Sequence, residues 1–153
     1  MLKRNALRLL GVLCWTLVAC REGSQPRPAA QSESETFASA VGWEVGAGAS
    51  GIAIAGQFAT VPGGQEERLI PTLPNATQAW LSRCSPQLAE RTANLDIWLT
   101  ILPGGKVKEA RAVGASTPLS RCLVDAISAQ TLSGLTLPGE TRIALRLALS
   151  KPA

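Results

Sequence analysis

The sequence contains no histidine, and this absence restricts its chemistry more than any other feature of its composition. Histidine is the usual general base near neutral pH, the commonest metal ligand and an obligatory part of Ser-His and Cys-His nucleophilic sites. Acid–base chemistry would have to rest on carboxylates such as Glu44, Glu66, Glu67 or Asp96, which form no recognisable catalytic pair. We therefore predict that the chain is not an enzyme and holds no metal or cofactor.

The N-terminus lacks an apolar run long enough to span a bilayer. Leu9 to Ala19 is apolar, but a membrane-spanning helix needs about 20 such residues, whereas 7 to 15 are typical of a signal-peptide core. Lys3, Arg4 and Arg8 supply the positive charge that precedes such a core. Residues 1–19 are therefore predicted to be a signal peptide.

The end of this run resembles the lipobox of bacterial lipoproteins, in the four residues Leu17-Val18-Ala19-Cys20. The resemblance implies that the thiol of Cys20 is acylated and that Cys20 becomes the first residue of the mature chain. More than one acyl chain is needed for stable membrane residence. Arg21, where an Asp would favour inner-membrane retention, implies an anchor in the outer membrane facing the periplasm. The alternative is an ordinary cleavage site with a cysteine there by chance.

The mature chain lacks a strong net charge and has the length of one modest domain. The whole sequence has 153 residues and a formal charge of +4. Removal of the three basic residues of the signal peptide leaves twelve basic residues against eleven acidic ones. A nucleic-acid partner, which would need clustered Lys and Arg on the folded part, is not expected.

Cysteines are few, and the signal peptide removes one of them, Cys14. With Cys20 acylated, Cys84 and Cys122 remain as an even pair in an oxidising compartment. We expect a disulfide between them. The alternative is two separate buried thiols.

Two segments are predicted to precede the compact domain. Residues 20–36 are polar, with prolines and no hydrophobic periodicity, and are predicted to be a disordered tether. Residues 37–72 are rich in Gly and Ala and are expected to form a partly extended linker, laid against the domain by Trp43 and Phe58. The G-x-G-x-x-G spacing of Gly46, Gly48 and Gly51 lacks the following helix that dinucleotide binding requires.

The predicted domain, residues 73–153, combines helices and strands. A helix with Asn75 as its N-cap is expected to carry Cys84, and a second helix is expected to begin with Thr117 as its N-cap and Pro118 in its first turn. Alternating apolar residues predict strands at 95–102, 106–116 and 141–149, with a β-bulge near Lys108 or Glu109. These elements predict an α+β fold with a three-stranded antiparallel sheet and two helices.

This order resembles the TonB C-terminal-like domains, and within them most closely the AgmX/PglI C-terminal domains. The resemblance covers about residues 76–150 and rests on five features. They are Cys84 in the first helix, Gly104-Gly105-Lys106-Val107 after the first strand, Cys122 in the second helix, Leu137-Pro138, and the apolar last strand. It implies a non-catalytic interaction module of the cell envelope, in which a sheet edge pairs with an extended segment of a protein partner.

Trp98 is the predicted partner-binding residue, because the alternation of β positions places it opposite Leu95, Ile97 and Leu99. If the glycine-rich segment covers that face, Trp98 is instead a packing residue. Lys106, Lys108, Glu109 and Arg111 are expected to form a solvated strand face. A non-peptide-binding structural lipoprotein of an envelope or motility assembly is the alternative function. An energy transducer is not expected, because a lipid anchor cannot replace a membrane-spanning helix.

Overall fold

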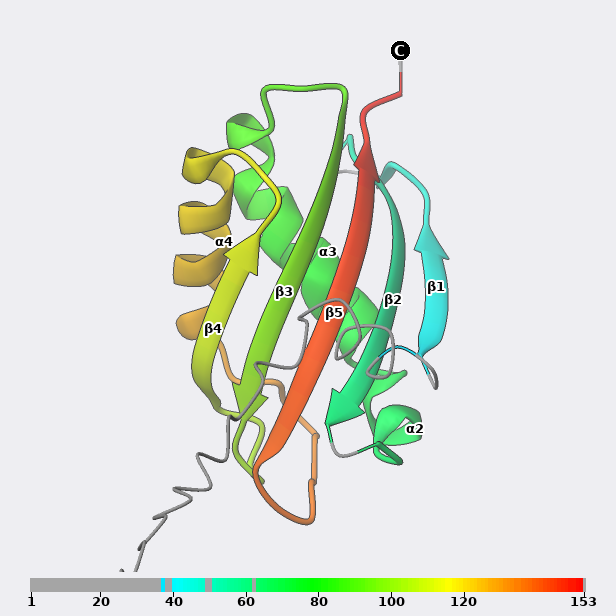
Figure 1. Cartoon of the computed structure of the whole chain (residues 1–153), viewed down its shortest axis with the longest axis vertical. Coiled ribbons are helices and arrows are strands. Elements are labelled where there is room, and N and C mark those ends of the chain that lie inside the picture. The colour runs from blue at the N-terminus through cyan, green and yellow to red at the C-terminus, as the bar shows by residue number, and fades with distance from the viewer. Residues whose placement is uncertain (1–36, 38–39, 49–50, 62, 153) are drawn as a thin grey trace, which may run out of the picture.

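The computed structural model describes residues 37, 40–48, 51–61 and 63–152 (Figure 1). The predictions for the signal peptide, for acylation of Cys20 and for the tether at residues 20–36 lie outside the described residues.

One antiparallel sheet of five strands dominates the described part of the chain (Figure 1). In chain order the strands are β1 (Val41–Val45), β2 (Ala53–Val61), β3 (Thr92–Ile101), β4 (Val107–Val113) and β5 (Thr141–Ser150). Their spatial order is β1-β2-β5-β3-β4, so β5 lies at the centre, between β2 and β3. β1 and β4 form the two edges.

Three helices accompany the sheet within the described residues. They are α2 (Glu66–Leu69), α3 (Leu73–Cys84) and α4 (Thr117–Ser128), and a 3-10 turn, η2 (Ser85–Gln87), follows α3. The α+β class is confirmed, whereas the expectation of three strands and two helices is wrong. The segment predicted to be a partly extended linker contributes β1, β2 and α2.

The sequence predicts these two strands only as extended parts of a linker, because glycine interrupts their hydrophobic pattern. Gly56 stands on the core face of β2, between the buried Ile54 and Phe58. The indole of Trp43, from the paired position of β1, fills the space that a side chain at Gly56 would take. Trp43 also meets Phe58 edge-to-face, with ring centroids 5.6 Å apart. Trp43 of β1 and Phe58 of β2 thus hold this segment against the domain, and the segment forms two strands of the sheet.

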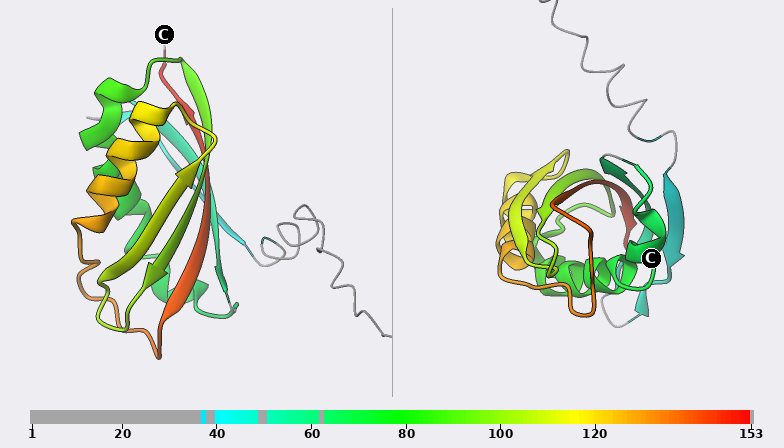
Figure 2. Two further views of the ribbon diagram at one scale, coloured as in Figure 1. Left: turned by 60° about the vertical axis from the view of Figure 1, so that its left-hand side comes forward. Right: turned by 90° about the horizontal axis from the view of Figure 1, so that it is seen from below.

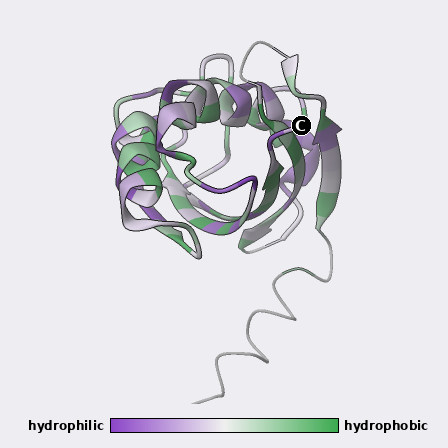
Figure 3. Ribbon diagram, turned by 90° about the horizontal axis from the view of Figure 1, so that it is seen from above, coloured by the Kyte–Doolittle hydropathy of each residue, from purple (hydrophilic) through white to green (hydrophobic). Residues whose placement is uncertain are grey.

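The helices α3 and α4 pack on one face of the sheet, which curves around them (Figures 2 and 3). Alternate residues of the strands point into this layer, as the buried side chains of Leu95, Ile97 and Leu99 on β3 illustrate. Leu119, Leu123, Ala126 and Ile127 form the buried face of α4, as the helical spacing predicts. No helix of the described residues lies on the opposite face, which is called the outer face below (Figure 2).

The N-caps of both helices precede the expected ones, by three residues in α3 and by one residue in α4. Thr72, not Asn75, is the N-cap of α3, and Asn75 lies in its first turn with its side-chain amide donating to the carbonyl of Pro71 at 3.4 Å. Ser116, not Thr117, is the N-cap of α4. Pro74 and Pro118 fall in the first turns, where a missing N–H costs no helical hydrogen bond.

The bulge in β4 is confirmed. Thr100 pairs with Glu109 and Ile101 with Val107, so Lys108 is the extra residue on its strand. The turn before it needs glycine at Gly105, because its φ is +83° and a Cβ would lie 2.2 Å from the carbonyl oxygen of Leu132. This close approach ties the β3–β4 turn to the segment after α4.

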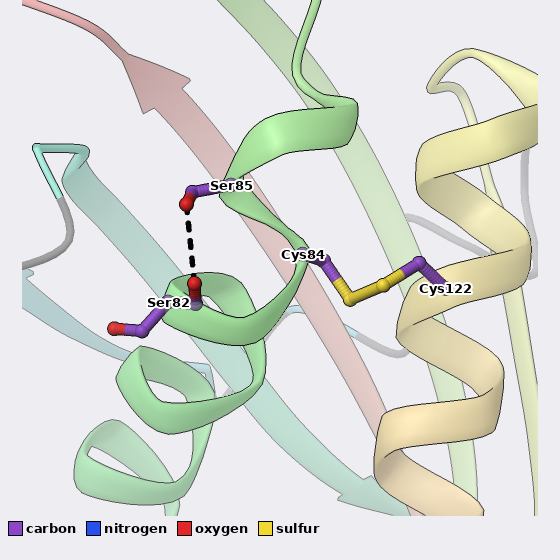
Figure 4. The surroundings of a disulfide bond; sticks show 4 residues. All are labelled: Ser82, Cys84, Ser85 and Cys122. Atoms are coloured by element: carbon purple, nitrogen blue, oxygen red, sulfur yellow. Dashed lines mark hydrogen bonds between the residues drawn. A yellow bond between two sulfur atoms is a disulfide. The ribbon is translucent and has the colours of Figure 1, made fainter.

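A disulfide joins the C-terminal end of α3 to α4 (Figure 4). The sulfur atoms of Cys84 and Cys122 are 2.05 Å apart and the Cα atoms 5.8 Å apart. Cys84 is fully buried, and Cys122 is packed against the core. Just beyond Cys84, the hydroxyl of Ser85 donates to the carbonyl of Ser82 at 3.1 Å.

Candidate partner-binding site

The outer face of the sheet presents Trp98 beside basic residues from two neighbouring strands. In the strand register Trp98 lies opposite Arg111 on β4 and Ala144 on β5. Trp98 is half-buried, and Arg111 is exposed. The alternation in the sequence therefore placed Trp98 on the correct face.

The described part of the glycine-rich segment does not cover Trp98. Its two strands extend the sheet on the far side of β5, so β5 and β2 separate Trp98 from β1. β1 and β2, the strands of that segment, therefore do not lie over Trp98. Trp98 lies on the outer face of the sheet.

A small depression of about 250 Å³ surrounds Trp98 and is lined by Thr100, Glu109, Arg111 and Arg142. Within the described residues the ion pairs are Lys108 with Glu140 at 2.8 Å and Arg146 with Asp96 at 2.9 Å. Arg111 and Arg142 are in neither. A half-buried tryptophan beside two arginines that are in neither ion pair has the composition typical of binding hot spots. We call Trp98, Arg111 and Arg142 the Trp98 patch.

A wider groove of about 880 Å³ lies next to the patch on the outer face. The face is hollowed there because Gly42, Ala55 and Ala148 have little or no side chain. The Nε of Arg146 donates to Asp96, and its guanidinium carbon lies 4.5 Å from the ring centroid of Phe37. Phe37 is thus a described side chain that lies on the outer face.

The two edges of the sheet differ in their protection against strand addition. The β4 edge carries the charged residues Lys108, Glu109 and Arg111, contains the bulge and has α4 beside it (Figure 1). Charges and bulges are common devices that prevent edge pairing. β1 has no bulge and a single charged residue, Glu44. No described strand pairs with the edge of β1 that points away from β2. β1 is therefore the less protected edge.

Glu66 is a structural carboxylate that holds the end of β2 against α2. It is 7 % exposed, and it accepts hydrogen bonds from the backbone N–H of Thr60 at 2.9 Å, the hydroxyl of Thr60 at 2.8 Å and the N–H of Gly64 at 2.8 Å. Burial alone would raise the pKa of Glu66, but the hydrogen bonds together hold that pKa below its ordinary value. All described donors to Glu66 come from its own chain neighbourhood.

The other carboxylates named as candidates for acid–base chemistry lie apart. Asp96 is in the ion pair with Arg146, Glu44 is exposed on β1, and Glu67 is exposed on α2. Among residues 37–152 that are described, no group of three acidic or cysteine side chains could hold a metal ion.

The three glycines that spell G-x-G-x-x-G lie in or near the β1–β2 connection, with φ of +40° at Gly48 and +65° at Gly51. Antiparallel strands flank this connection, so the strand–turn–helix context of a dinucleotide site is not present there.

Among the described residues, no helix has both the length and the apolar character needed to cross a membrane. Comparison with known proteins found no match for this chain among protein families, curated proteins or solved structures. The resemblance to TonB C-terminal-like domains therefore remains a prediction.

Sequence reasoning missed three residues of the outer face: Phe37, Arg142 and Arg146. The sequence predicts Arg111 only as part of a solvated strand face. The alternation in β5 contained a usable signal, because Arg142, Ala144 and Arg146 occupy the positions between the buried leucines and isoleucine. The alternation does not predict the order of the strands in the sheet, and it is this order that places β5 directly beside β3.

Proposed function

We propose that this chain is a lipid-anchored interaction module of the cell envelope, which binds a protein partner in the periplasm by adding an extended segment of that partner to β1. The observation that carries the proposal is the unprotected edge at β1, in a sheet whose other edge strand, β4, carries charged residues and a β-bulge. Backbone pairing at such an edge supplies affinity without special side chains.

The lipid anchor follows from the resemblance of Leu17-Val18-Ala19-Cys20 to a lipobox. A tether of residues 20–36 would hold the folded part roughly 20 Å from the lipid surface, at about 5 to 6 Å times the square root of the number of residues. Such a module can reach partners at or near the membrane. An outer-membrane location facing the periplasm is part of the same proposal.

The experiment compares two glycine substitutions that add the same charge in different places. Gly42→Lys places a lysine on β1, where the new Cβ would meet only the carbonyl oxygen of Gly56 at 3.7 Å, an ordinary contact. Gly104→Lys, the control, places it in the β3–β4 turn, where a Cβ has nothing within 4 Å. Lysine on an edge strand opposes strand addition.

Affinity capture from detergent-solubilised membranes is followed by hydrogen exchange of the purified complex. We expect a partner that is retained by the wild type and by Gly104→Lys, lost by Gly42→Lys, and protective of the amides of β1. A partner bound equally by all three chains, or one that leaves the β1 amides unprotected, contradicts edge pairing at β1.

A further inference from the structure

On the helix side of the sheet, β1 presents an apolar row that is only partly covered. Val41, Trp43 and Val45, called the apolar row below, pack against the core but are half-buried. The β2 residues Phe58 and Ile54, which pair with Val41 and Val45, are 0 % and 2 % exposed. β1 is the edge strand, with no described strand beyond it (Figure 1). A further strand with apolar side chains on this face would cover the row.

On the outer face, β1 carries two exposed positions with different properties. Gly42 has no side chain, whereas Glu44 is an exposed carboxylate. In the strand register Glu44 lies beside Ala55 of β2. Ala55 lies beside Ala148 of β5, and Ala148 beside Asn94 of β3. Small or neutral side chains thus continue from Glu44 across the next three strands.

Glu44 is the charged group that two hollows of the outer face share. It lines the groove of about 880 Å³ and a neighbouring groove of about 460 Å³. The other charged residues of the larger groove, Asp96 and Arg146, are paired with each other, and Glu44 is the only charged residue that lines the smaller one. Glu44 is in neither ion pair of the described residues. This part of the outer face is therefore negative, and a basic side chain would complement it.

The geometry of a β-sheet determines which residues of an added strand would meet these groups. Five partner residues beside Val41–Val45 would alternate between the two faces of the sheet. The first, third and fifth would lie next to the apolar row, and the second and fourth next to Gly42 and Glu44. This pattern is symmetric, so it is the same for a parallel and for an antiparallel segment.

We propose that the partner segment recognised at β1 is a basic alternating one. It has apolar side chains at three alternate positions on the helix side, and between them a lysine or arginine on the outer face beside Glu44. The inference rests on the proposed edge pairing at β1 and adds the chemical class of the segment. Backbone pairing supplies affinity, whereas the apolar row and Glu44 select the sequence.

The test uses three synthetic peptides and the isotope-labelled protein as it is purified from membranes in detergent. The first peptide is Thr-Val-Lys-Val-Lys-Val-Thr, the second has glutamate in place of both lysines, and the third has the composition of the first with its valines adjacent. NMR titration of the backbone amides of Val41–Val45 gives a dissociation constant for each peptide. The variant is Glu44→Lys. Its matched control is Glu109→Lys, which reverses an exposed charge on the other edge strand.

The lysine peptide should shift the β1 amides and bind the wild type several-fold more tightly than the glutamate peptide does, because one exposed charge pair changes an affinity by up to about five-fold. Glu44→Lys should reverse this preference, since the glutamate peptide then meets a lysine. Glu109→Lys should leave the preference unchanged. The peptide with adjacent valines should bind most weakly, because it cannot cover the apolar row and also place a lysine beside Glu44.

Three results overturn this inference and leave edge pairing in place. They are equal affinity of the lysine and glutamate peptides at β1, a preference for lysine that persists in Glu44→Lys, and equal affinity of the peptide with adjacent valines. Shifts that are absent from β1 with all three peptides overturn edge pairing as well. The amide shifts of each variant away from the substituted site report whether its fold is intact.

Discussion

At the scale of single residues, Glu66 connects charge state to stability. Its two carboxylate oxygens accept three hydrogen bonds from Thr60 and Gly64. In Glu66→Gln one oxygen can be kept, but the amide N–H₂ then faces an N–H donor. We expect a loss of about 1 to 3 kcal/mol in the free energy of unfolding, the cost of an unsatisfied buried polar group. Urea unfolding at pH 7 measures it, and the exposed Glu67→Gln is the control.

The pH dependence of stability follows from the same carboxylate. The folded-state pKa of Glu66 lies below its ordinary value of 4.5, so the stabilisation is complete above that value and is lost as the pH falls through the lower folded-state pKa. Urea unfolding between pH 3 and pH 7, with Glu66→Gln beside the wild type, should show a smaller loss of stability in acid for the variant. Equal slopes would contradict this role.

The candidate site was predictable at one residue and not at its neighbours. Strict alternation along β3 placed Trp98 opposite the core side chains without knowledge of the fold. Arg142 could be assigned to the outward face of its own strand, but not to the side of Trp98. That adjacency depends on pairing between β3 and β5, whose paired residues are far apart in the sequence.

At the scale of elements, the β1–β2 hairpin depends on the absence of a side chain at Gly56. A Cβ there would lie 2.4 Å from the indole of Trp43. Gly56→Ala should displace Trp43 from Phe58 and cost about 1 to 3 kcal/mol, as overpacking does. Thermal unfolding measures it. Gly42→Ala on the facing strand, where the nearest atom would be at 3.7 Å, is the control and should change stability little.

The disulfide between α3 and α4 closes a long loop of the chain and so restricts the unfolded state. Its cysteines are 38 positions apart, and a ring of that size is worth about 4 kcal/mol in the loop-entropy model. Cys84→Ala/Cys122→Ala should therefore lower the free energy of unfolding by this order, as measured by urea unfolding without reductant. Mass spectrometry of the wild type before and after reduction and alkylation checks the bond itself. Two alkylated cysteines without prior reduction would contradict it.

Elements with a regular apolar period were predictable, and those without one were not. α4 and the strands β3 to β5 show clear periods of 3.6 or 2 residues, and each is found close to its expected bounds. The apolar patterns of β1 and β2 are short or interrupted, because Trp43 of β1 fills the space of a side chain at Gly56 of β2. The sequence of β2 alone does not show that a residue of another strand fills this space.

At the scale of the whole molecule, the anchor and the sheet are separate parts of the proposed function. Cys20→Ala should move the chain from the membrane fraction to the soluble fraction after export, because several buried acyl chains are needed for stable residence. Cell fractionation with immunoblotting measures the distribution, and labelling with a radioactive fatty acid checks the acylation. The control is Cys20 left intact with Arg21→Ala. Membrane residence that persists in Cys20→Ala would contradict the lipid anchor.

The position of β5 has a consequence for the order of events during biosynthesis. β5 is the last described strand along the chain, yet it occupies the centre and pairs with β2 and β3. The β1–β2 hairpin is synthesised early. It cannot become part of one sheet with β3 until residues 141–150 have been synthesised, because β5 lies between β2 and β3. The sheet therefore cannot close on a growing chain, and its distant pairings favour slow folding. A polypeptide that stays open until its final strand arrives is suited to export through a narrow channel in the unfolded state.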